Sequence, residues 1–249
     1  MTEDRNSDRV WQSDDLARLY LDNIRGAIPL AAEQIDVMLR LIGTREDPVR
    51  RFMDLGCGDG VLGLAVLGDY PEAQGVFIDF SDSMLDACRT RLASRGAQAV
   101  VQELDYGQSS WLETVRPHGP YDAIVSGFSI HHQADERKRE LYGEIHDLLA
   151  PGGWFVQVEH CAPESAVAHR LFEETFIDNI HALLVREGRP SDRDEIRRKF
   201  VDRVDKQANN LSPVNVQCDW LREIGFEEVD CFLKIHELAV FGGRRRFDF

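Results

Sequence analysis

Apolar residues along the chain follow two different patterns. In residues 13–26 and 31–42 they recur at helical intervals, and Pro29 separates the two stretches. We expect residues 1–44 to form an N-terminal helical lid. From residue 45 onward, short continuous apolar runs alternate with helical stretches, which predicts an α/β fold with a buried, mostly parallel sheet. These runs fall at residues 52–55, 75–79, 99–104, 121–127 and 154–158.

The remaining third of the chain has another organisation. Residues 162–215 predict inserted helices with an apolar stripe that includes Phe172 and Phe176, and we expect them to cap a substrate pocket. An amphipathic helix then ends at Gly225, and two strands follow at residues 229–233 and 238–241. So short a connection makes a hairpin, so the last strand should run antiparallel. Residues 244–246 are expected to be a solvated tail.

The first strand leads into a glycine-rich turn, which is the most informative stretch of the sequence. Residues 52–60 read Phe-Met-Asp-Leu-Gly-Cys-Gly-Asp-Gly, and a helix should start at Asp59 or Gly60. A dinucleotide fingerprint, Gly-x-Gly-x-x-Gly, would place glycine where this chain has Val61. Asp54 also precedes the turn and would repel a pyrophosphate. The turn therefore favours a cationic nucleoside over a dinucleotide.

This stretch resembles motif I of the class I S-adenosylmethionine-dependent methyltransferases, acid-x-Gly-x-Gly-x-Gly. The resemblance covers roughly residues 45–160 and 215–242. It implies a doubly wound, mostly parallel seven-stranded sheet with the last strand antiparallel and helices on both faces. Residues 45–249 would form the methyltransferase domain. The implied cofactor is S-adenosyl-L-methionine, with S-adenosyl-L-homocysteine as the product, and Asp54, Gly56, Cys57 and Gly58 would hold it.

Two further strands end in acids. Asp79 lies 19 residues beyond Gly60, where the end of the second strand of a βαβ unit accepts hydrogen bonds from ribose hydroxyls. Asp105 and Tyr106 follow the third strand, and the resemblance implies that Asp105 accepts a bond from the adenine amino group. An alternative role for Asp105 is to cap the next helix. Because parallel strands end along one crevice, we expect Asp54, Asp79 and Asp105 to lie on one rim.

Other side chains are candidates for the cofactor site. Phe80 and Met84 are placed to pack against adenine, although Met84 also has the helical spacing of a core residue. Ser126 ends the fourth strand, in the loop that would line the transferred methyl group. The resemblance implies that the lid covers the cofactor, with Tyr20 and Arg25 reaching its carboxylate or the substrate. A packed Tyr20 and a solvated Arg25 are equally open.

The substrate side is predicted from the ends of the fourth and fifth strands. Residues 126–132 read Ser-Gly-Phe-Ser-Ile-His-His, and this run and the sequence LLAPGG at residues 148–153 resemble small-molecule methyltransferases. Enzymes that methylate base or glutamine amide nitrogens usually carry Asn/Asp-Pro-Pro-aromatic in this loop, which is absent here. His131, Glu159 and His160 are the candidate catalytic residues, as base or orienting groups.

Two other roles are open for these residues. With His132, they could converge on zinc or iron, but adjacent histidines rarely face one ion, so we predict no metal site. His131 and His132 could also be hydrogen-bonded loop residues.

Composition narrows the class of partner. The 249 residues carry a formal charge of −15 and a pI near 4.9, which opposes binding to nucleic acid or an anionic membrane. Five cysteines without close pairs, and no long apolar run, predict a reduced cytoplasmic protein. A small-molecule methyl acceptor fits best, with the chain as a monomer or homodimer.

The sequence thus predicts methyl transfer from S-adenosylmethionine to a nucleophilic O, N or C atom of a small metabolite. An NAD-dependent oxidoreductase would use the same sheet, but Val61 and Asp54 oppose it. A non-catalytic cofactor-binding scaffold or partner protein is the other alternative, since methyltransferase folds can serve as scaffolds.

Overall fold

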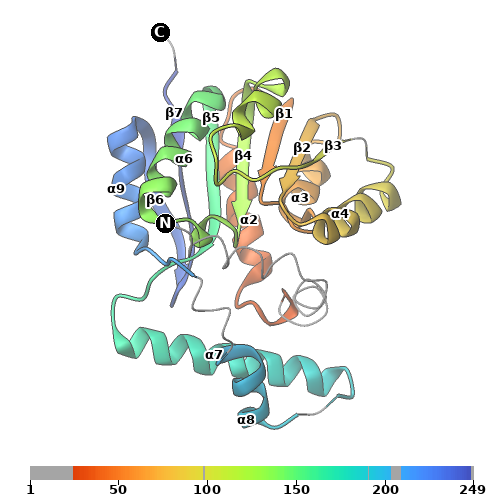
Figure 1. The fold of residues 1–249 in the computed structure, drawn as a ribbon, viewed down its shortest axis with the longest axis vertical. Coiled ribbons are helices and arrows are strands. Elements are labelled where there is room, and N and C mark those ends of the chain that lie inside the picture. Colours follow the sequence, from red (N-terminus) through yellow and green to blue (C-terminus); the bar gives the residue numbers. More distant parts are fainter. Residues whose placement is uncertain (1–24, 98, 190, 203–208, 248–249) are drawn as a thin grey trace.

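A computed structural model describes residues 25–97, 99–189, 191–202 and 209–247. Within them, seven strands form one sheet in the order β3-β2-β1-β4-β5-β7-β6 (Figure 1). β7 runs antiparallel to both neighbours, and the other pairings are parallel. The predicted mostly parallel, seven-stranded sheet with its last strand antiparallel is confirmed. The strands are β1 Arg51–Leu55, β2 Gln74–Asp79, β3 Ala99–Glu103, β4 Tyr121–Gly127, β5 Leu149–His160, β6 Phe226–Ile235 and β7 Leu238–Arg245.

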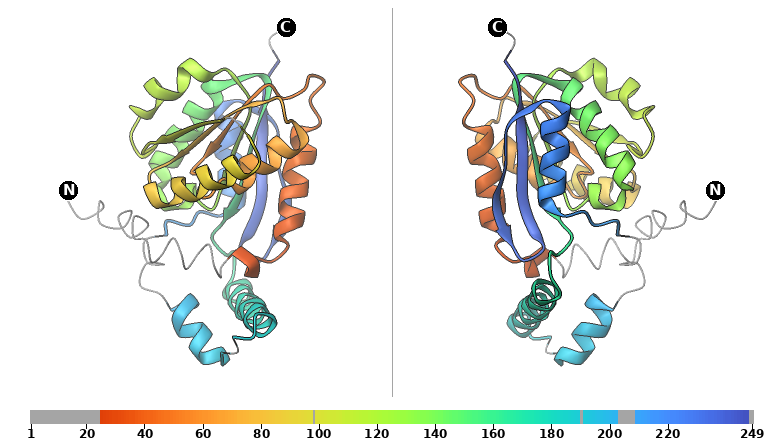
Figure 2. Two further views of the ribbon diagram at one scale, coloured as in Figure 1. Left: turned by 90° about the vertical axis from the view of Figure 1, so that its right-hand side faces the viewer. Right: turned by 90° about the vertical axis from the view of Figure 1, so that its left-hand side faces the viewer.

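Helices cover both faces of the sheet (Figure 2). One face packs against α2 Ala31–Ile42, α3 Val61–Asp69 and α4 Asp82–Ser94, and the other against α5 Trp111–Val115, α6 Asp135–Leu148 and α9 Val214–Ile224. Each layer has its own apolar cluster, so the sheet is buried on both sides, as its continuous apolar strands require. α9 ends before Gly225, whose φ of 114° suits glycine.

The last two strands are longer than the predicted residues 229–233 and 238–241. The hairpin turn at residues 236–237 is as short as expected, but β7 continues through Arg244 and Arg245. Arg245 Nη1 donates to the Leu149 carbonyl at 2.6 Å, at the start of β5. The expectation of a solvated tail at residues 244–246 was wrong for these two arginines, because backbone pairing with β5 and β6 extends to them.

The inserted segment lies beyond the carboxyl ends of the parallel strands, at the bottom of Figure 1. It contains α7 Ala166–Arg186, the short α8 Arg193–Ile196 and the π-helical turn η7 Arg197–Val201. Arg193 and Arg197 on α8 and η7 pair with acids of α7, and a small apolar cluster lies between these elements. We call this segment the cap.

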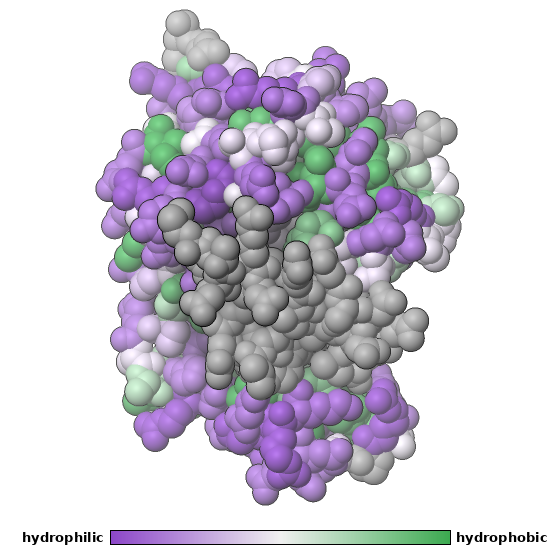
Figure 3. All heavy atoms as spheres, in the orientation of Figure 1, coloured by the Kyte–Doolittle hydropathy of each residue, from purple (hydrophilic) through white to green (hydrophobic). Residues whose placement is uncertain are grey.

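Hydrophilic residues dominate the coloured part of the face in Figure 3.

The N-terminal helix predicted over residues 13–26 lies almost wholly outside the described residues. The described residues begin with the short 3-10 helix η4 Arg25–Ala27. The second predicted helix, residues 31–42, is confirmed as α2. None of the helices in the described part of the chain has both the length and the apolar composition that crossing a membrane requires.

Candidate active site

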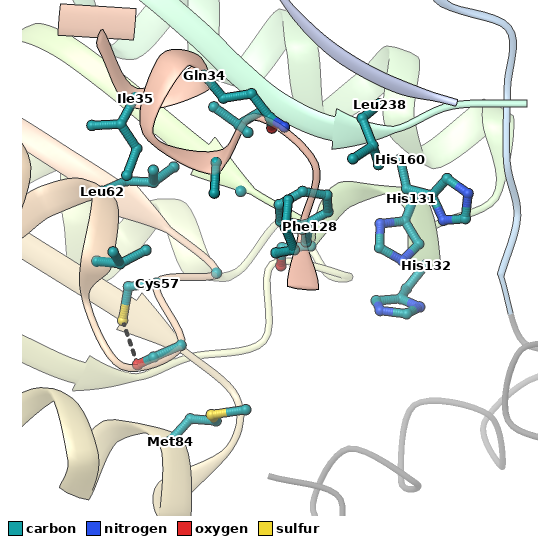
Figure 4. A pocket seen from close by; sticks show the side chains of 18 of the residues that line it. Gln34, Ile35, Cys57, Leu62, Met84, Phe128, His131, His132, His160 and Leu238 are labelled. Atoms are coloured by element: carbon teal, nitrogen blue, oxygen red, sulfur yellow. Dashed lines mark hydrogen bonds between the residues drawn. The ribbon is translucent and has the colours of Figure 1, made fainter. Parts of the chain in front are cut away.

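A cavity opens at the carboxyl ends of the strands, beside the point where the strand order reverses between β1 and β4. Open α/β sheets bind their ligands at this point. The cavity is lined by the glycine turn, the ends of β2, β4 and β5, the start of α2 and the cap. Figure 4 shows Cys57 and Met84 on one side of it and the rings of His131, His132 and His160 on the other.

The glycine turn has the shape predicted from its composition. Gly56, Gly58 and Gly60 all have positive φ angles, of 64°, 53° and 79°. A Cβ on Gly56 would lie 1.8 Å from the Ser129 Oγ, whereas a Cβ on Gly58 would meet no heavy atom within 4 Å. Gly56 is therefore needed for packing within the protein, and Gly58 keeps the cavity side of the turn open.

Two of the predicted strand-end acids line the cavity. Asp54 is buried and its Oδ2 accepts from the Gly63 amide at 2.7 Å, at the start of α3. Asp79 accepts from the amides of Gly58 at 2.8 Å and Ser81 at 2.9 Å. Burial raises the pKa of Asp79, and these backbone bonds oppose the rise. A carboxylate has about four acceptor positions, so Asp79 retains capacity for hydroxyl donors of a ligand.

Three other predicted cofactor residues line the cavity, and two cannot be placed from the described residues. Cys57, Phe80 and Met84 line the cavity beside Asp79. Tyr20 lies outside the described residues, and of Arg25 only the backbone is described. Their proposed contacts with a cofactor stay predictions.

Three predicted residues do not line the cavity and have bonds within the protein instead. Asp105 Oδ1 accepts from the Gly107 amide at 2.7 Å, closing a local turn rather than capping α5. The Tyr106 hydroxyl bonds the Ser129 Oγ at 2.5 Å, and Ser126 Oγ donates to the Leu55 carbonyl at 2.7 Å. Through these bonds, Tyr106 holds the loop that follows β4, and Ser126 holds the end of β1 next to the glycine turn.

The predicted substrate-side residues do come together. His131 Nδ1 lies 2.6 Å from Oε1 of Glu159, which is fully buried. The same carboxylate accepts from the His160 amide at 2.8 Å and from Gln157 Nε2 at 3.0 Å. Since a carboxylate only accepts, Nδ1 of His131 carries the proton and, in the neutral ring, Nε2 carries the lone pair. His131 therefore has the form of an oriented base.

Glu159 stays ionised despite its burial. Burial by itself would raise the pKa of Glu159, but its interaction with His131 and the hydrogen bonds from Gln157 and the His160 amide together lower it. The bonds extend away from the cavity, because the Tyr142 hydroxyl donates to Gln157 Oε1 at 3.0 Å. Gln157 thus links the Glu159 carboxylate to Tyr142.

We expect this arrangement to make stability fall in acid. A carboxyl group whose pKa is lowered by folding adds stability that is complete above its unfolded pKa, about 4.3 for Glu, and that is lost as the pH falls through the lower folded value. Urea unfolding between pH 3 and 6 should therefore show a steeper acid loss in the wild type than in a Glu159→Gln variant. Equal slopes would contradict an ionised, stabilising Glu159.

His160 is held by a second carboxylate that was not predicted. Glu237, in the turn between β6 and β7, is buried and places Oε2 2.7 Å from His160 Nε2 and Oε1 2.7 Å from His169 Nδ1. His169 belongs to α7, so Glu237 connects the cap to the end of β5. Burial lowers the pKa of His160, although the bond to Glu237 opposes this.

His132 completes the histidine side of the cavity. Its ring centre is 4.0 Å from that of His131, whose centre is 5.9 Å from that of His160. Burial and the proximity of His131, His160 and Lys138 lower the pKa of His132 well below its ordinary value. Among the residues that the structure describes, no group of three or more His, Cys, Asp or Glu side chains could hold a metal ion.

Comparison with known proteins finds similarity to methyltransferases. Residues 53–155 match a family model described as a methyltransferase domain. The demethylmenaquinone methyltransferase of Thermus thermophilus is 33% identical over 118 residues, which cover 47% of this chain and 50% of that protein. The chain thus spans half the length of this curated relative.

Solved structures share the fold at low sequence identity. An O-methyltransferase family protein from Burkholderia thailandensis matches 100% of this chain and 62% of its own, with a TM-score of 0.63 and 17% identity. Human N-acetylserotonin methyltransferase, solved in complex with S-adenosylmethionine, matches 99% of this chain and 57% of its own, with a TM-score of 0.57 and 13% identity. The predicted class I methyltransferase fold is confirmed.

Proposed function

We propose that this chain, whose residues 53–155 match a methyltransferase domain, uses S-adenosylmethionine to methylate an O, N or C atom of a small molecule. One observation carries the proposal. The glycine turn with Asp54 and Asp79 and the His131–Glu159 pair face the same cavity, so a methyl donor on one side would meet a base on the other.

The residues on the glycine-turn side fit this cofactor. Gly58 leaves open space for a ligand, and Asp79 has acceptor capacity for ribose hydroxyls. The buried carboxylate of Asp54 suits a sulfonium or ammonium group and would repel a diphosphate. When bound, S-adenosylmethionine supplies an already activated methyl group, so the protein mainly has to align donor and acceptor and exclude water.

His131 supplies the proton chemistry. Its Nε2 takes the proton that an acceptor O–H, N–H or activated C–H group loses, and the positive charge that forms on the ring is stabilised by Glu159 at 2.6 Å. Glu159 itself stays ionised, because its pKa is lowered. His160, held by Glu237, is a second group on the same side that can orient the acceptor.

A small acceptor is supported by charge and enclosure. The formal charge of −15 disfavours nucleic acid and anionic membranes. The cap lies across the site and supplies Phe172, Phe176 and Phe200 to the cavity wall.

A screen of metabolites with the protein and S-adenosylmethionine, read as a mass gain of one methyl group, tests the activity. Absence of S-adenosylhomocysteine binding by calorimetry would refute the proposal.

The ribose assignment gives a direct prediction. An Asp79→Ala variant should bind S-adenosylhomocysteine more weakly by about 1–3 kcal/mol, because charge-assisted hydrogen bonds to the ribose are lost. Isothermal titration calorimetry measures the change. Asp82→Ala is the matched control, since its side chain is 68% exposed on α4 and pairs with Arg89, and it should bind as the wild type does. Unchanged affinity in Asp79→Ala would remove Asp79 from the site.

A further inference from the structure

Aromatic side chains extend from the histidine side of the cavity along the cap. The ring of Phe172 on α7 lies 5.1 Å from that of His160, between centres, and Phe176 follows at 6.0 Å with its plane tilted by only 17° from that of Phe172. Phe200 of η7 also lines the cavity. We call Phe172, Phe176 and Phe200 the aromatic wall. It is continuous with the group of histidines that contains the base.

The charged side chains that the structure describes in the cavity lining lie away from the aromatic wall. Among the described residues that line the cavity, there is no lysine or arginine, and the acids Asp54 and Asp79 are on the glycine-turn side. Burial lowers the pKa values of His132 and His160, which disfavours the charged form of both rings. Lys199 Nζ lies 5.5 Å from the ring centre of Phe200, but Lys199 is exposed and does not line the cavity.

From this arrangement we infer that the methyl acceptor is an uncharged molecule with an apolar body, preferably aromatic, which lies against Phe172 and Phe176 and directs one weakly acidic group to His131. The inference rests on the proposed function and specifies its substrate class. Aromatic rings pack favourably on the faces and edges of phenylalanine. An anionic group at the aromatic wall would lose its hydration without gaining a lysine or arginine partner from the described cavity lining, which is costly.

A matched pair of probes tests the inference on the protein saturated with S-adenosylhomocysteine. 2-Naphthol is neutral, has a two-ring apolar body and carries one weakly acidic hydroxyl. 6-Hydroxy-2-naphthoate has the same body and hydroxyl, with a carboxylate at the far end. By calorimetry, we expect 2-naphthol to bind at least tenfold more tightly than 6-hydroxy-2-naphthoate.

Placing a cation in the aromatic wall should reverse this preference. In Phe176→Arg, 6-hydroxy-2-naphthoate should bind more tightly than 2-naphthol, because the carboxylate gains a guanidinium partner. Leu171→Arg is the matched control: it adds the same side chain to α7 at a position that is 50% exposed, and it should keep the wild-type preference. Melting temperature and S-adenosylhomocysteine affinity report whether both variants fold.

The possible outcomes separate the two proposals. If S-adenosylhomocysteine does not bind, the proposed function itself fails. If it binds, but 2-naphthol fails to bind or binds no better than 6-hydroxy-2-naphthoate, the acceptor class is overturned and the cofactor assignment stands. If the wild type shows the preference and a folded Phe176→Arg does not reverse it, the placement of the acceptor against the aromatic wall is overturned. Should Phe176→Arg not fold, the wild-type pair alone decides the acceptor class.

Discussion

A His131→Gln variant is expected to lose methyl transfer by about 10²–10⁴-fold in kcat, because general base catalysis contributes about this much. Glutamine can still donate a hydrogen bond toward Glu159, so the buried carboxylate keeps a partner. The amide of this glutamine cannot accept a proton at neutral pH. The rate is measured at saturating S-adenosylmethionine with the acceptor found by the metabolite screen.

The matched control is the neighbouring histidine. His132→Gln should change kcat by less than about tenfold, because the bond to Glu159 that orients the proposed base is made by His131. Affinity for S-adenosylhomocysteine should be unchanged in both variants, since neither ring belongs to the glycine-turn side of the cavity. Near wild-type turnover in His131→Gln, or equal losses in the two variants, would contradict the role of His131 as the base.

Much of the fold could be predicted because it depends on local patterns. Continuous apolar runs identified the buried parallel strands, and a short connection identified the antiparallel hairpin. Parallel strands end on the same side of a sheet, so placing Asp54 and Asp79 at strand ends was enough to bring them to one cavity. The same rule brought His131 to Glu159 across 28 positions of sequence.

The position of a residue at a strand end does not determine where its side chain points. This explains why Ser126 and Asp105 do not line the cavity. Ser126 pairs with Leu55 across β1 and β4, and its hydroxyl turns to the Leu55 carbonyl. Asp105 follows β3 at the edge of the sheet, where its carboxylate closes a turn onto Gly107. Sequence position located both near the correct edge of the sheet but could not separate a lining residue from a supporting one.

Glu237 and the aromatic wall depend on tertiary contacts that leave little trace in the sequence. Glu237 reaches His160 because β7 pairs antiparallel with β5 in a register that places Leu238 opposite His160. That register is set by the packing of the whole sheet edge. The apolar stripe with Phe172 and Phe176 predicted a cap over a substrate pocket, but the register of these rings beside His160 depends on the path of the cap.

Replacing Gly56 and replacing Gly58 should affect different properties of the protein. Gly56→Ala is expected to lower the free energy of unfolding by about 2–5 kcal/mol. A φ of 64° costs an L-residue about 1–2 kcal/mol, and overpacking costs about 1–3 kcal/mol more. The overlap is severe because the Cβ would lie 1.8 Å from the Ser129 Oγ, which the Tyr106 hydroxyl holds in place.

Gly58→Ala should instead leave the fold largely intact and impair the ligand. Its φ of 53° costs about 1–2 kcal/mol, and the added Cβ meets no protein atom within 4 Å. The methyl group would occupy the space of a ligand beside Asp79, so S-adenosylhomocysteine should bind at least tenfold more weakly. Urea unfolding of the ligand-free variants and calorimetry with S-adenosylhomocysteine separate the two effects. Full affinity in Gly58→Ala would show that the cofactor does not lie over this turn, because the open space at Gly58 would then have no occupant to displace.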